Sequence, residues 1–339
     1  MTIAAAVSGG MDSLMALALL RDEGHDVIAV HAHFLPPDER QRAVAAALDA
    51  QCRALGVPFH AVDLSRAFRE RVIEPFMAAY AAGLTPNPCA GCNRDMKFGL
   101  LFDEAARLGA DRIATGHYAR LDGGLRRGAD PAKDQSYFLT LTPRQSLDRA
   151  VFPLGEWRKA ELPAALAARG LAVPLPSESQ EVCFIPDDDY RAFLLAQGAD
   201  LPGEGPVRLA DGREIGRHKG LWRHTIGQRK GLGIPWSEPL YVLDKLAEKN
   251  DLVVGPKSAL DSHECRARGV NLLVAPGLWP DTVLAQTCYR QKARPARAVL
   301  EADGTLALRF AAPVPRPTPG QVAAIYDETG LALAGATIV

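Results

Sequence analysis

The sequence predicts an α/β protein with a doubly wound parallel sheet, followed by a small β-rich central domain and a C-terminal β-barrel. Strand-like and helix-like segments alternate from the N-terminus to about Gly116, which is typical of a parallel sheet covered on both sides. From Leu201 the pattern changes to short strand-like runs separated by glycine. From about Ser258 to Val339 strand-like runs alternate with turn signals. We place the predicted domains at residues 1–197, 198–257 and 258–339.

The N-terminal elements follow from their hydrophobic pattern. Thr2 to Val7 is an apolar run typical of a buried strand, and the helix after it ends at Gly24. The alternation continues with predicted strands at 27–33, 59–63 and 112–115 and predicted helices at 39–55, 66–82 and 97–108. Because ligands bind outside the carboxyl ends of parallel strands, the turns after the first strand and at Gly116-His117 are expected on the same rim.

Proline and glycine mark the segments between and after these elements. Two prolines between Thr85 and Asn93 predict a loop with fixed bends, and helical, proline-punctuated sequence continues to about Gln197. Strand-like runs follow at 205–216 and 240–244. Turn signals at 276–277, 303–304, 319–320 and 329–330 indicate a small β-barrel or a sandwich.

The composition is that of an ordinary globular protein, with 47% hydrophobic and 23% charged residues among 339. No apolar run is long enough to span a bilayer and the N-terminus reads as a strand, so we expect a cytoplasmic protein with no membrane partner. The net charge is −1, yet residues 208–230 hold seven Lys or Arg against two Asp or Glu. A second basic patch contains Arg290, Lys292, Arg294 and Arg297. Such patches either bind a phosphate backbone or form a solvated face.

The run from Val7 to Ser13 lies between the first predicted strand and its helix. Its two glycines allow a tight turn that presents backbone N–H groups to an anion. Ser8 and Ser13 add hydroxyl donors, and the carboxylate of Asp12 can hold Mg²⁺. The run lacks the lysine of a Walker A loop. It resembles the pyrophosphate-binding loop (PP-loop) of the ATP pyrophosphatases, which cleave ATP to AMP and pyrophosphate; a chance turn is the alternative.

Three of the six cysteines stand out. Cys89 and Cys92 form a C-x-x-C pair whose thiols lie within reach of one metal ion or of each other. A closed zinc site needs four ligands, and the chain has no second C-x-x-C. Cys183 lies far away in sequence and, taken alone, reads as a buried core cysteine more readily than as a catalytic one.

Nine strings occur in an order that resembles the tRNA-specific 2-thiouridylase family, usually called MnmA or TrmU, over nearly the whole chain. They lie at residues 8–13 (SGGMDS), 85–88 (TPNP), 92–93 (CN), 97–98 (KF), 114–118 (ATGHY), 133–139 (KDQSYFL), 183–185 (CFI), 224–233 (HTIGQRKGLG) and 318–321 (TPGQ). The two longest strings are far more specific than the glycine loop alone.

The resemblance implies an ATP-dependent enzyme that makes 2-thiouridine at the wobble position of tRNAs for lysine, glutamate and glutamine. Transfer of AMP to the uracil oxygen makes that oxygen a leaving group, with Asp12 serving the adenylation step. A thiolate-borne sulfur then attacks the ring carbon. In the family picture the position of Cys183 receives a persulfide from a cysteine desulfurase or a sulfur-relay protein. The position of Cys92 helps release the sulfur by forming a disulfide with Cys183.

The resemblance also assigns binding residues. Those of the ATP site are Ala6, Val7, Ser8, Gly9, Gly10, Met11, Asp12, Ser13, Ala32 and Gly116, with Ala32 standing where the family usually has methionine. Those that face the flipped target base are Asn87, Pro88 and Cys89. The other tRNA-contacting positions are His117, Lys133, Asp134, Gln135, Cys288, Tyr289 and Gln321. The basic stretch from Arg217 to Lys230 is expected to contact phosphates of the anticodon stem.

Two departures from the family pattern leave the sulfur chemistry open. Cys89 stands where familiar members have aspartate, so the chain has three cysteines where the persulfide route needs two. Cys89, Cys92 and Cys183 could instead ligate a 4Fe–4S cluster with an open iron that carries sulfide. Cys288 replaces an arginine and removes one phosphate contact, with Arg290 as an alternative donor.

Two other classes of function compete with this hypothesis. One is a different PP-loop enzyme that adenylates tRNA, of the lysidine synthetase or 2-thiocytidine type, or an amidotransferase-type synthetase on the same loop. The other is a non-catalytic tRNA-binding relic or a structural zinc protein. The presence of Asp12, Cys92 and Cys183 together argues against a relic. All of these assignments require the glycine loop and the distant thiols to converge in space.

Overall fold

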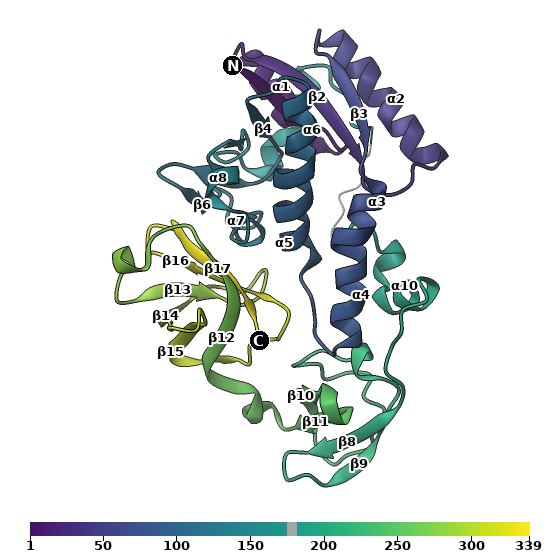
Figure 1. Cartoon of the computed structure of the whole chain (residues 1–339), viewed down its shortest axis with the longest axis vertical. Helices are drawn as coiled ribbons and strands as arrows, with labels where there is room; N and C mark the ends of the chain where they lie inside the picture. Colours follow the sequence, from purple (N-terminus) through teal and green to yellow (C-terminus); the bar gives the residue numbers. More distant parts are fainter. Residues whose placement is uncertain (175–181) are drawn as a thin grey trace.

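The computed structural model describes residues 1–174 and 182–339 and shows three regions in sequence order (Figure 1). The predicted helical stretch up to Gln197 therefore includes seven residues, 175–181, that lie outside the described part. An α/β region carries the N-terminus, a small β-rich region follows at the bottom of Figure 1, and a barrel lies beside the α/β region.

The α/β region is built on a five-stranded sheet whose paired strands are all parallel, in the order β3-β2-β1-β4-β7. Its strands are β1 (Thr2–Ala6), β2 (Asp26–His33), β3 (Phe59–Asp63), β4 (Arg112–Ala114) and β7 (Ala150–Val151). β1 is central and almost solvent-free, with Ile3 and Ala5 each 1% exposed. The strand order reverses between β1 and β4, and such a switch point is where open α/β sheets bind ligands.

The first helices cover this sheet as the sequence predicts. α1 (Met11–Asp22) follows β1, and α2 (Glu39–Ala54) begins at Asp38, whose side chain accepts a 2.7 Å bond from the Gln41 N–H. The predicted helix at 66–82 is a continuous helix made of α3 (Ser65–Phe68), a π-helical turn η1 (Arg69–Ile73) and α4 (Glu74–Ala81). Pro75 is the second residue of α4 and has no N–H to donate to the turn before it, which accounts for the local break in α-helical bonding.

The predicted loop at 85–93 is wrong from Pro88 onward. A helix begins there as α5 (Pro88–Cys92), continues as a π-helical segment η2 (Asn93–Leu100) and ends as α6 (Leu101–Arg107). Asn87 caps it, because its Oδ1 accepts a 3.2 Å bond from the Ala90 N–H. Pro88 takes the first helical position, where the missing N–H has no intrahelical partner to lose. Cys89 and Cys92 therefore lie on a helix.

Short elements complete the α/β region. They are β5 (Ala119–Leu121), β6 (Leu125–Arg127), α7 (Ser136–Leu139), α8 (Arg144–Leu147), η3 (Lys159–Glu161), α9 (Leu162–Ala168), η4 (Pro186–Asp188) and α10 (Tyr190–Ala196). α9 packs on α1, and β5 pairs with β6 in a hairpin. Within residues 1–174 and 182–339, every helix is too short or too polar to traverse a bilayer.

The central region is a four-stranded sheet in the order β10-β11-β8-β9. Its elements are β8 (Gly205–Leu209), β9 (Glu214–His218), η5 (Leu221–Arg223), β10 (Tyr241–Leu246), η6 (Ala247–Lys249), β11 (Asp251–Gly255) and η7 (Lys257–Leu260). Val207, Val242 and Val254 are each fully buried and form the centre of its small core.

The C-terminal region is a closed six-stranded barrel, which confirms the predicted fold class and decides between barrel and sandwich. Around the barrel the strands are β12 (Asp261–Leu272), β15 (Leu306–Pro315), β14 (Arg294–Leu300), β13 (Val283–Gln286), β16 (Val322–Tyr326) and β17 (Ala332–Ile338), with η8 (Pro276–Leu278) before β13. Closure leaves no unpaired sheet edge, which suits a sequence of short strands.

Candidate active site

The glycine loop after β1 is held in shape by its own serine. The Ser13 Oγ accepts a 3.0 Å bond from the Ser8 N–H and donates a 2.9 Å bond to the Gly10 carbonyl. Gly9 has a φ of 88°, a conformation that side chains other than glycine rarely adopt. No side chain caps α1 at Gly10, so the first N–H groups of this helix face the loop and can bind an anion. Ser13 therefore stabilises the conformation of the loop, whereas the Ser8 side chain is exposed.

Gly116 brings the turn after β4 against the start of α1. A Cβ at this position would lie 2.7 Å from the backbone carbon of Asp12 and 2.8 Å from the nitrogen of Ser13. Only glycine therefore allows this approach, and the two predicted rim segments do meet. The other predicted nucleotide positions lie at the same edge, with Ala6 and Val7 ending β1 and Ala32 near the end of neighbouring β2.

Asp12 is the charged group of this loop, and it has two partners. Its Oδ1 accepts a 2.7 Å bond from the Tyr118 hydroxyl and lies 2.6 Å from the Nζ of Lys159. Lys159 reaches it from η3, 147 residues away in sequence. Sequence reasoning missed Lys159, because a single lysine after Trp157-Arg158 matches no motif and only the fold places it beside the carboxylate.

The three candidate thiols differ in exposure, and two of them act on the third. Cys92 is buried at 9% exposure, Cys89 is half-buried and Cys183 is accessible to solvent. Burial raises the pKa of Cys92 to about 12, with negative charge on Cys183 and Cys89 adding to the rise and Lys97 opposing it. Cys183 is exposed as a residue, yet burial of its thiol raises its pKa, again against the charge of Lys97. Phe184, next to Cys183, belongs to the same apolar core cluster as Cys92, so the two segments meet in one part of the α/β region.

Lys97 and His117 connect the thiols to the nucleotide loop. The Lys97 Nζ lies 3.5 Å from the His117 Nε2, and the Thr115 Oγ1 lies 2.7 Å from the His117 Nδ1. Burial, and then the positive charge of Lys97, hold the pKa of His117 well below its usual range, so the imidazole is neutral. His117 was predicted to contact tRNA, but the structure places it inside the protein at 6% exposure.

Several other predicted tRNA contacts already have partners within the chain. Asp134 accepts bonds from the Gly128 N–H at 3.0 Å and from Arg127 at 2.8 Å. Gln135 accepts a 3.1 Å bond from the Tyr118 N–H. These two side chains fix the segment that precedes α7, a role that the sequence analysis did not assign to them. Lys133 lies in the same turn and is half-buried.

The residues predicted to face the target base lie where the α/β region contacts the barrel. Asn87 hydrogen-bonds Tyr137, whose hydroxyl donates a 2.9 Å bond to the Val322 carbonyl of the barrel. The Tyr289 ring stacks beside Phe138 with 4.3 Å between centroids. Cys288 next to it is half-buried, and burial raises its pKa.

Thr85, two residues before Asn87, contacts residues of the barrel and of the central region and so joins all three regions. The Thr85 N–H donates to the Pro319 carbonyl at 2.9 Å, and the Gln321 Nε2 donates to the Thr85 carbonyl at 2.8 Å. From the central region the Nζ of Lys245 donates to the Thr85 hydroxyl at 3.4 Å. Gln321 is predicted to contact tRNA, and in the structure its side-chain amide holds the segment that leads into α5.

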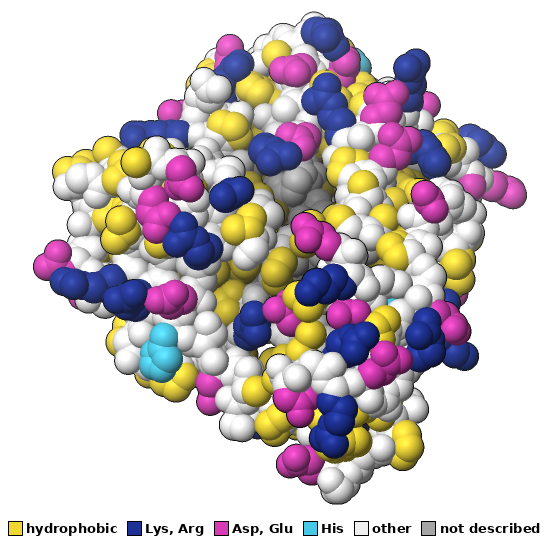
Figure 2. Space-filling view, turned by 60° about the horizontal axis from the view of Figure 1, so that its bottom comes forward, with side chains coloured by type: hydrophobic (Ala, Val, Ile, Leu, Met, Phe, Trp, Pro, Cys, Tyr) yellow, Lys and Arg dark blue, Asp and Glu magenta, His cyan; other side chains and the backbone are white. Residues whose placement is uncertain are grey.

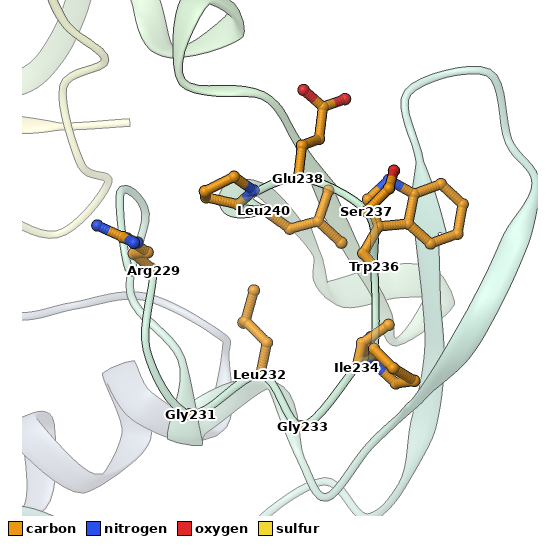
Figure 3. A pocket seen from close by; sticks show the side chains of 11 residues that line it. Arg229, Gly231, Leu232, Gly233, Ile234, Trp236, Ser237, Glu238 and Leu240 are labelled. Atoms are coloured by element: carbon orange, nitrogen blue, oxygen red, sulfur yellow. The ribbon is translucent and has the colours of Figure 1, made fainter.

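Figure 2 shows a depression in the surface of the molecule, with hydrophobic side chains on part of its wall and Lys, Arg, Asp and Glu side chains around it. A separate cavity of about 690 Å³ lies in the central region, lined by residues 229 and 231–240 (Figure 3). Arg213 lies over the Trp236 ring at 5.4 Å, so the basic stretch and this cavity adjoin.

Family models match the chain along most of its length. Residues 1–187 match a tRNA methyl transferase HUP domain, 191–256 a tRNA methyl transferase PRC-barrel domain and 262–338 an aminomethyltransferase beta-barrel domain. Similar curated proteins named tRNA-specific 2-thiouridylase MnmA come from Oleidesulfovibrio alaskensis (56% identical), Nitratidesulfovibrio vulgaris (54%) and Lawsonia intracellularis (47%). Each alignment covers 100% of this chain and 99% of the relative. The chain therefore belongs to the family of tRNA-specific 2-thiouridylases.

Proposed function

We propose that this protein is an ATP-dependent tRNA-uridine 2-sulfurtransferase that acts on the wobble uridine of lysine, glutamate and glutamine tRNAs in the cytoplasm. The observation that carries the proposal is the chain of residues that links the nucleotide loop to the thiols. Gly116 abuts the backbone of Asp12, His117 follows Gly116, and His117 contacts Lys97, whose charge acts on Cys92 and Cys183. These links support one common site for adenylation and sulfur transfer.

The loop at the end of β1 suits the adenylation step. Its backbone N–H groups and the uncapped start of α1 would bind the leaving pyrophosphate. Asp12 is the carboxylate that would hold Mg²⁺, and this ion would neutralise phosphate charge. Lys159 supplies a second positive charge beside Asp12, in a loop that has no lysine of its own. The uracil oxygen attacks the α-phosphorus, AMP is attached to that oxygen, and pyrophosphate leaves.

The thiols of Cys92 and Cys183 suit the sulfur-transfer step. A cysteine desulfurase or sulfur-relay protein would transfer a sulfur atom to accessible Cys183 as a persulfide. The terminal sulfur attacks the ring carbon and AMP leaves with the oxygen. The Cys92 thiolate then attacks the Cys183 sulfur, so that a Cys92–Cys183 disulfide forms and the new sulfur stays on the uracil as the thiocarbonyl. An external dithiol must reduce the disulfide before the next turnover.

A resident 4Fe–4S cluster does not fit the residues as they are arranged. Cys92 is buried within the apolar core cluster, Cys89 is half-buried and Cys183 is exposed. A cluster held by all three thiols would have to enter the apolar packing around Cys92. The sulfur chemistry is therefore assigned to the persulfide. Anaerobic purification with assays of iron and acid-labile sulfide tests this choice, since iron-loaded protein that loses activity on iron removal would reverse it.

The proposed reaction is tested by mass spectrometry of tRNA nucleosides after incubation with the protein, ATP, Mg²⁺ and a cysteine desulfurase. We expect 2-thiouridine; lysidine or 2-thiocytidine would instead identify one of the other adenylating enzymes. Cys183→Ser should abolish thiolation and leave tRNA binding near normal, whereas Cys265→Ala in the barrel core should retain thiolation. Full activity of Cys183→Ser would overturn the role of that thiol.

A further inference from the structure

Three cationic side chains lie together where the α/β region meets the central region. Arg191 comes from α10, Arg223 from η5 and Lys245 from β10, and we call these three residues the cationic cluster. The Arg191 Nη2 donates to the carbonyl of Arg223. The Lys245 Nζ donates at 2.8 Å to the next carbonyl along the chain, that of His224. Two consecutive carbonyls therefore bind two of the cations beside the third.

His224 is the buried side chain within this group, at 6% exposure. In the described part of the chain, its Nδ1 and the Nε of Arg223 are buried and have no hydrogen-bond partner. The His218 ring lies 6.0 Å from the His224 ring, but its two nitrogens already bond the Gly220 N–H and the Asn250 carbonyl. Because buried polar atoms are normally hydrogen-bonded, a ligand that supplies the missing partner would be stabilised here.

The charge around His224 is positive. Within residues 1–174 and 182–339, the groups that act on it are His218 and the cationic cluster, and no carboxylate is among them. Burial, and then these groups, lower the pKa of His224 to about 4, so the imidazole is neutral. Two carboxylates adjoin the cluster in sequence, but Asp189 caps α10 and Asp244 binds Arg316 at 3.0 Å. An anion from outside the chain would therefore find uncompensated positive charge.

The cationic cluster also keeps N–H groups for such an anion. The Lys245 ammonium has three, of which two donate to the His224 carbonyl and the Thr85 hydroxyl. The Arg191 guanidinium has five, and its bonds to the Tyr190 hydroxyl and to a carbonyl use two of them. All three cluster side chains are half-buried, so a ligand can reach them. Arginine and lysine donors of this kind match the oxygens of a phosphate group.

We propose that Arg191, Arg223, His224 and Lys245 form a binding site for a phosphate group between the α/β and central regions. Arg191 and Lys245 lie outside the basic stretch that is expected to contact tRNA, so the site is defined by the fold and not by that stretch. That the phosphate is a phosphodiester of tRNA rests on the proposed function. In that case Lys245 would link the bound backbone to Thr85, two residues before Asn87 and the other positions that face the target base.

The first measurement is the salt dependence of tRNA binding by the full-length protein, followed by fluorescence anisotropy with unmodified tRNA that has a wobble uridine. Arg191→Met removes one charge and keeps an apolar side chain, and Arg191→Lys restores the charge. We expect Arg191→Met to weaken binding about tenfold near 0.1 M salt and to reduce the slope of log K against log salt by about one. Arg191→Lys should recover the slope. Arg40→Met, on the exposed face of α2, is the control for net charge.

The second measurement titrates the protein with inorganic phosphate while NMR follows the ring signals of its labelled histidines. We expect phosphate to shift the His224 signals in wild type and not in Lys245→Met. A reduced slope for Arg191→Met supports a tRNA phosphodiester as the occupant, whereas an unchanged slope with shifted His224 signals supports free phosphate. An unchanged slope together with unshifted His224 signals overturns the site. A reduced slope in a protein that forms no 2-thiouridine would contradict the proposed function and leave the phosphate site intact.

Discussion

The nucleotide loop and the thiol site lie in the same α/β region but are built in opposite ways. The loop is contiguous in sequence, and backbone bonds through Ser13 and the close approach of Gly116 fix its shape. The thiol site draws Cys92 and Cys183 from segments 91 residues apart by number, and burial, followed by the charges of neighbouring groups, shifts the pKa of both thiols. ATP binding at the loop should therefore respond to added side-chain volume, and the reactivity of the thiols should respond to a change in nearby charge.

The two sites also differ in how they depend on the rest of the molecule. The loop needs the sheet and Lys159, both within the α/β region. The helix that carries Cys92 is reached through Thr85, which the barrel and the central region both hold. A change outside the α/β region should therefore affect thiolation before it affects ATP binding.

The largest effect is expected from a methyl group at the loop. Gly116→Ala places a Cβ 2.7 Å from the backbone of Asp12, and overpacking of this kind costs about 1–3 kcal/mol. We expect ATP affinity, measured by titration calorimetry, to fall about 10- to 100-fold. The matched control is Gly91→Ala beside the thiols, where no atom lies within 4 Å of the added Cβ. Equal ATP affinity for the two variants would contradict the view that the nucleotide loop is the site that depends on close backbone packing.

A charge change at the loop should have a smaller effect that depends on magnesium. Lys159→Met leaves the Asp12 carboxylate without its cation next to an anionic nucleotide. We expect ATP affinity without Mg²⁺ to fall about tenfold, close to the cost of one lost charge-assisted bond, and Mg²⁺ to restore part of it. Asp12→Asn in the same background should reverse the loss measured without Mg²⁺. Titrations of Lys257→Met, in the central region, control for net charge.

The junction at Thr85 should separate thiolation from ATP binding. Gln321→Ala removes the 2.8 Å bond to the Thr85 carbonyl, worth about 1 kcal/mol. We expect thiolation to fall about fivefold, with ATP affinity unchanged and a small loss of thermal stability. Gln197→Ala, which removes a bond to exposed Arg69, serves as the control. If Gln321→Ala also lowered ATP affinity, the junction at Thr85 would affect the nucleotide loop as well as helix α5, which carries Cys92.

A pH dependence of stability is expected at the same junction. Burial lowers the pKa of Lys245 from 10.5 to about 8, so between these values the unfolded chain binds more protons than the folded one. Stability should therefore rise with pH across this window and be lowest below pH 8. Lys245→Met should reduce the slope, as measured by urea unfolding from pH 7.5 to 9.5, and Lys249→Met should not. Equal slopes for Lys245→Met and wild type would contradict this linkage.

Local patterns were enough to predict the parallel sheet, the glycine loop and the C-terminal barrel, because each depends on periodicity or turn chemistry within a short window. The loop predicted at 85–93 was wrong because a proline excludes the interior of a helix but suits its first position. Asn87 as a cap is the signal that distinguishes the two cases. The roles of Asp134, Gln135 and Gln321 within the chain followed from no motif, since their partners are backbone groups of other segments.

By itself the sequence determined which chemical groups are available: an anion-binding turn, a carboxylate for a divalent ion, and thiols in strings that resemble one enzyme family. Only the tertiary structure decided how those groups are charged and aimed. No local pattern predicts that Lys159 pairs with Asp12 or that the charge of Lys97 acts on Cys92 and Cys183, because both arrangements arise when distant segments pack together. Reactivity depends on dielectric and distance, and these are properties of the folded chain.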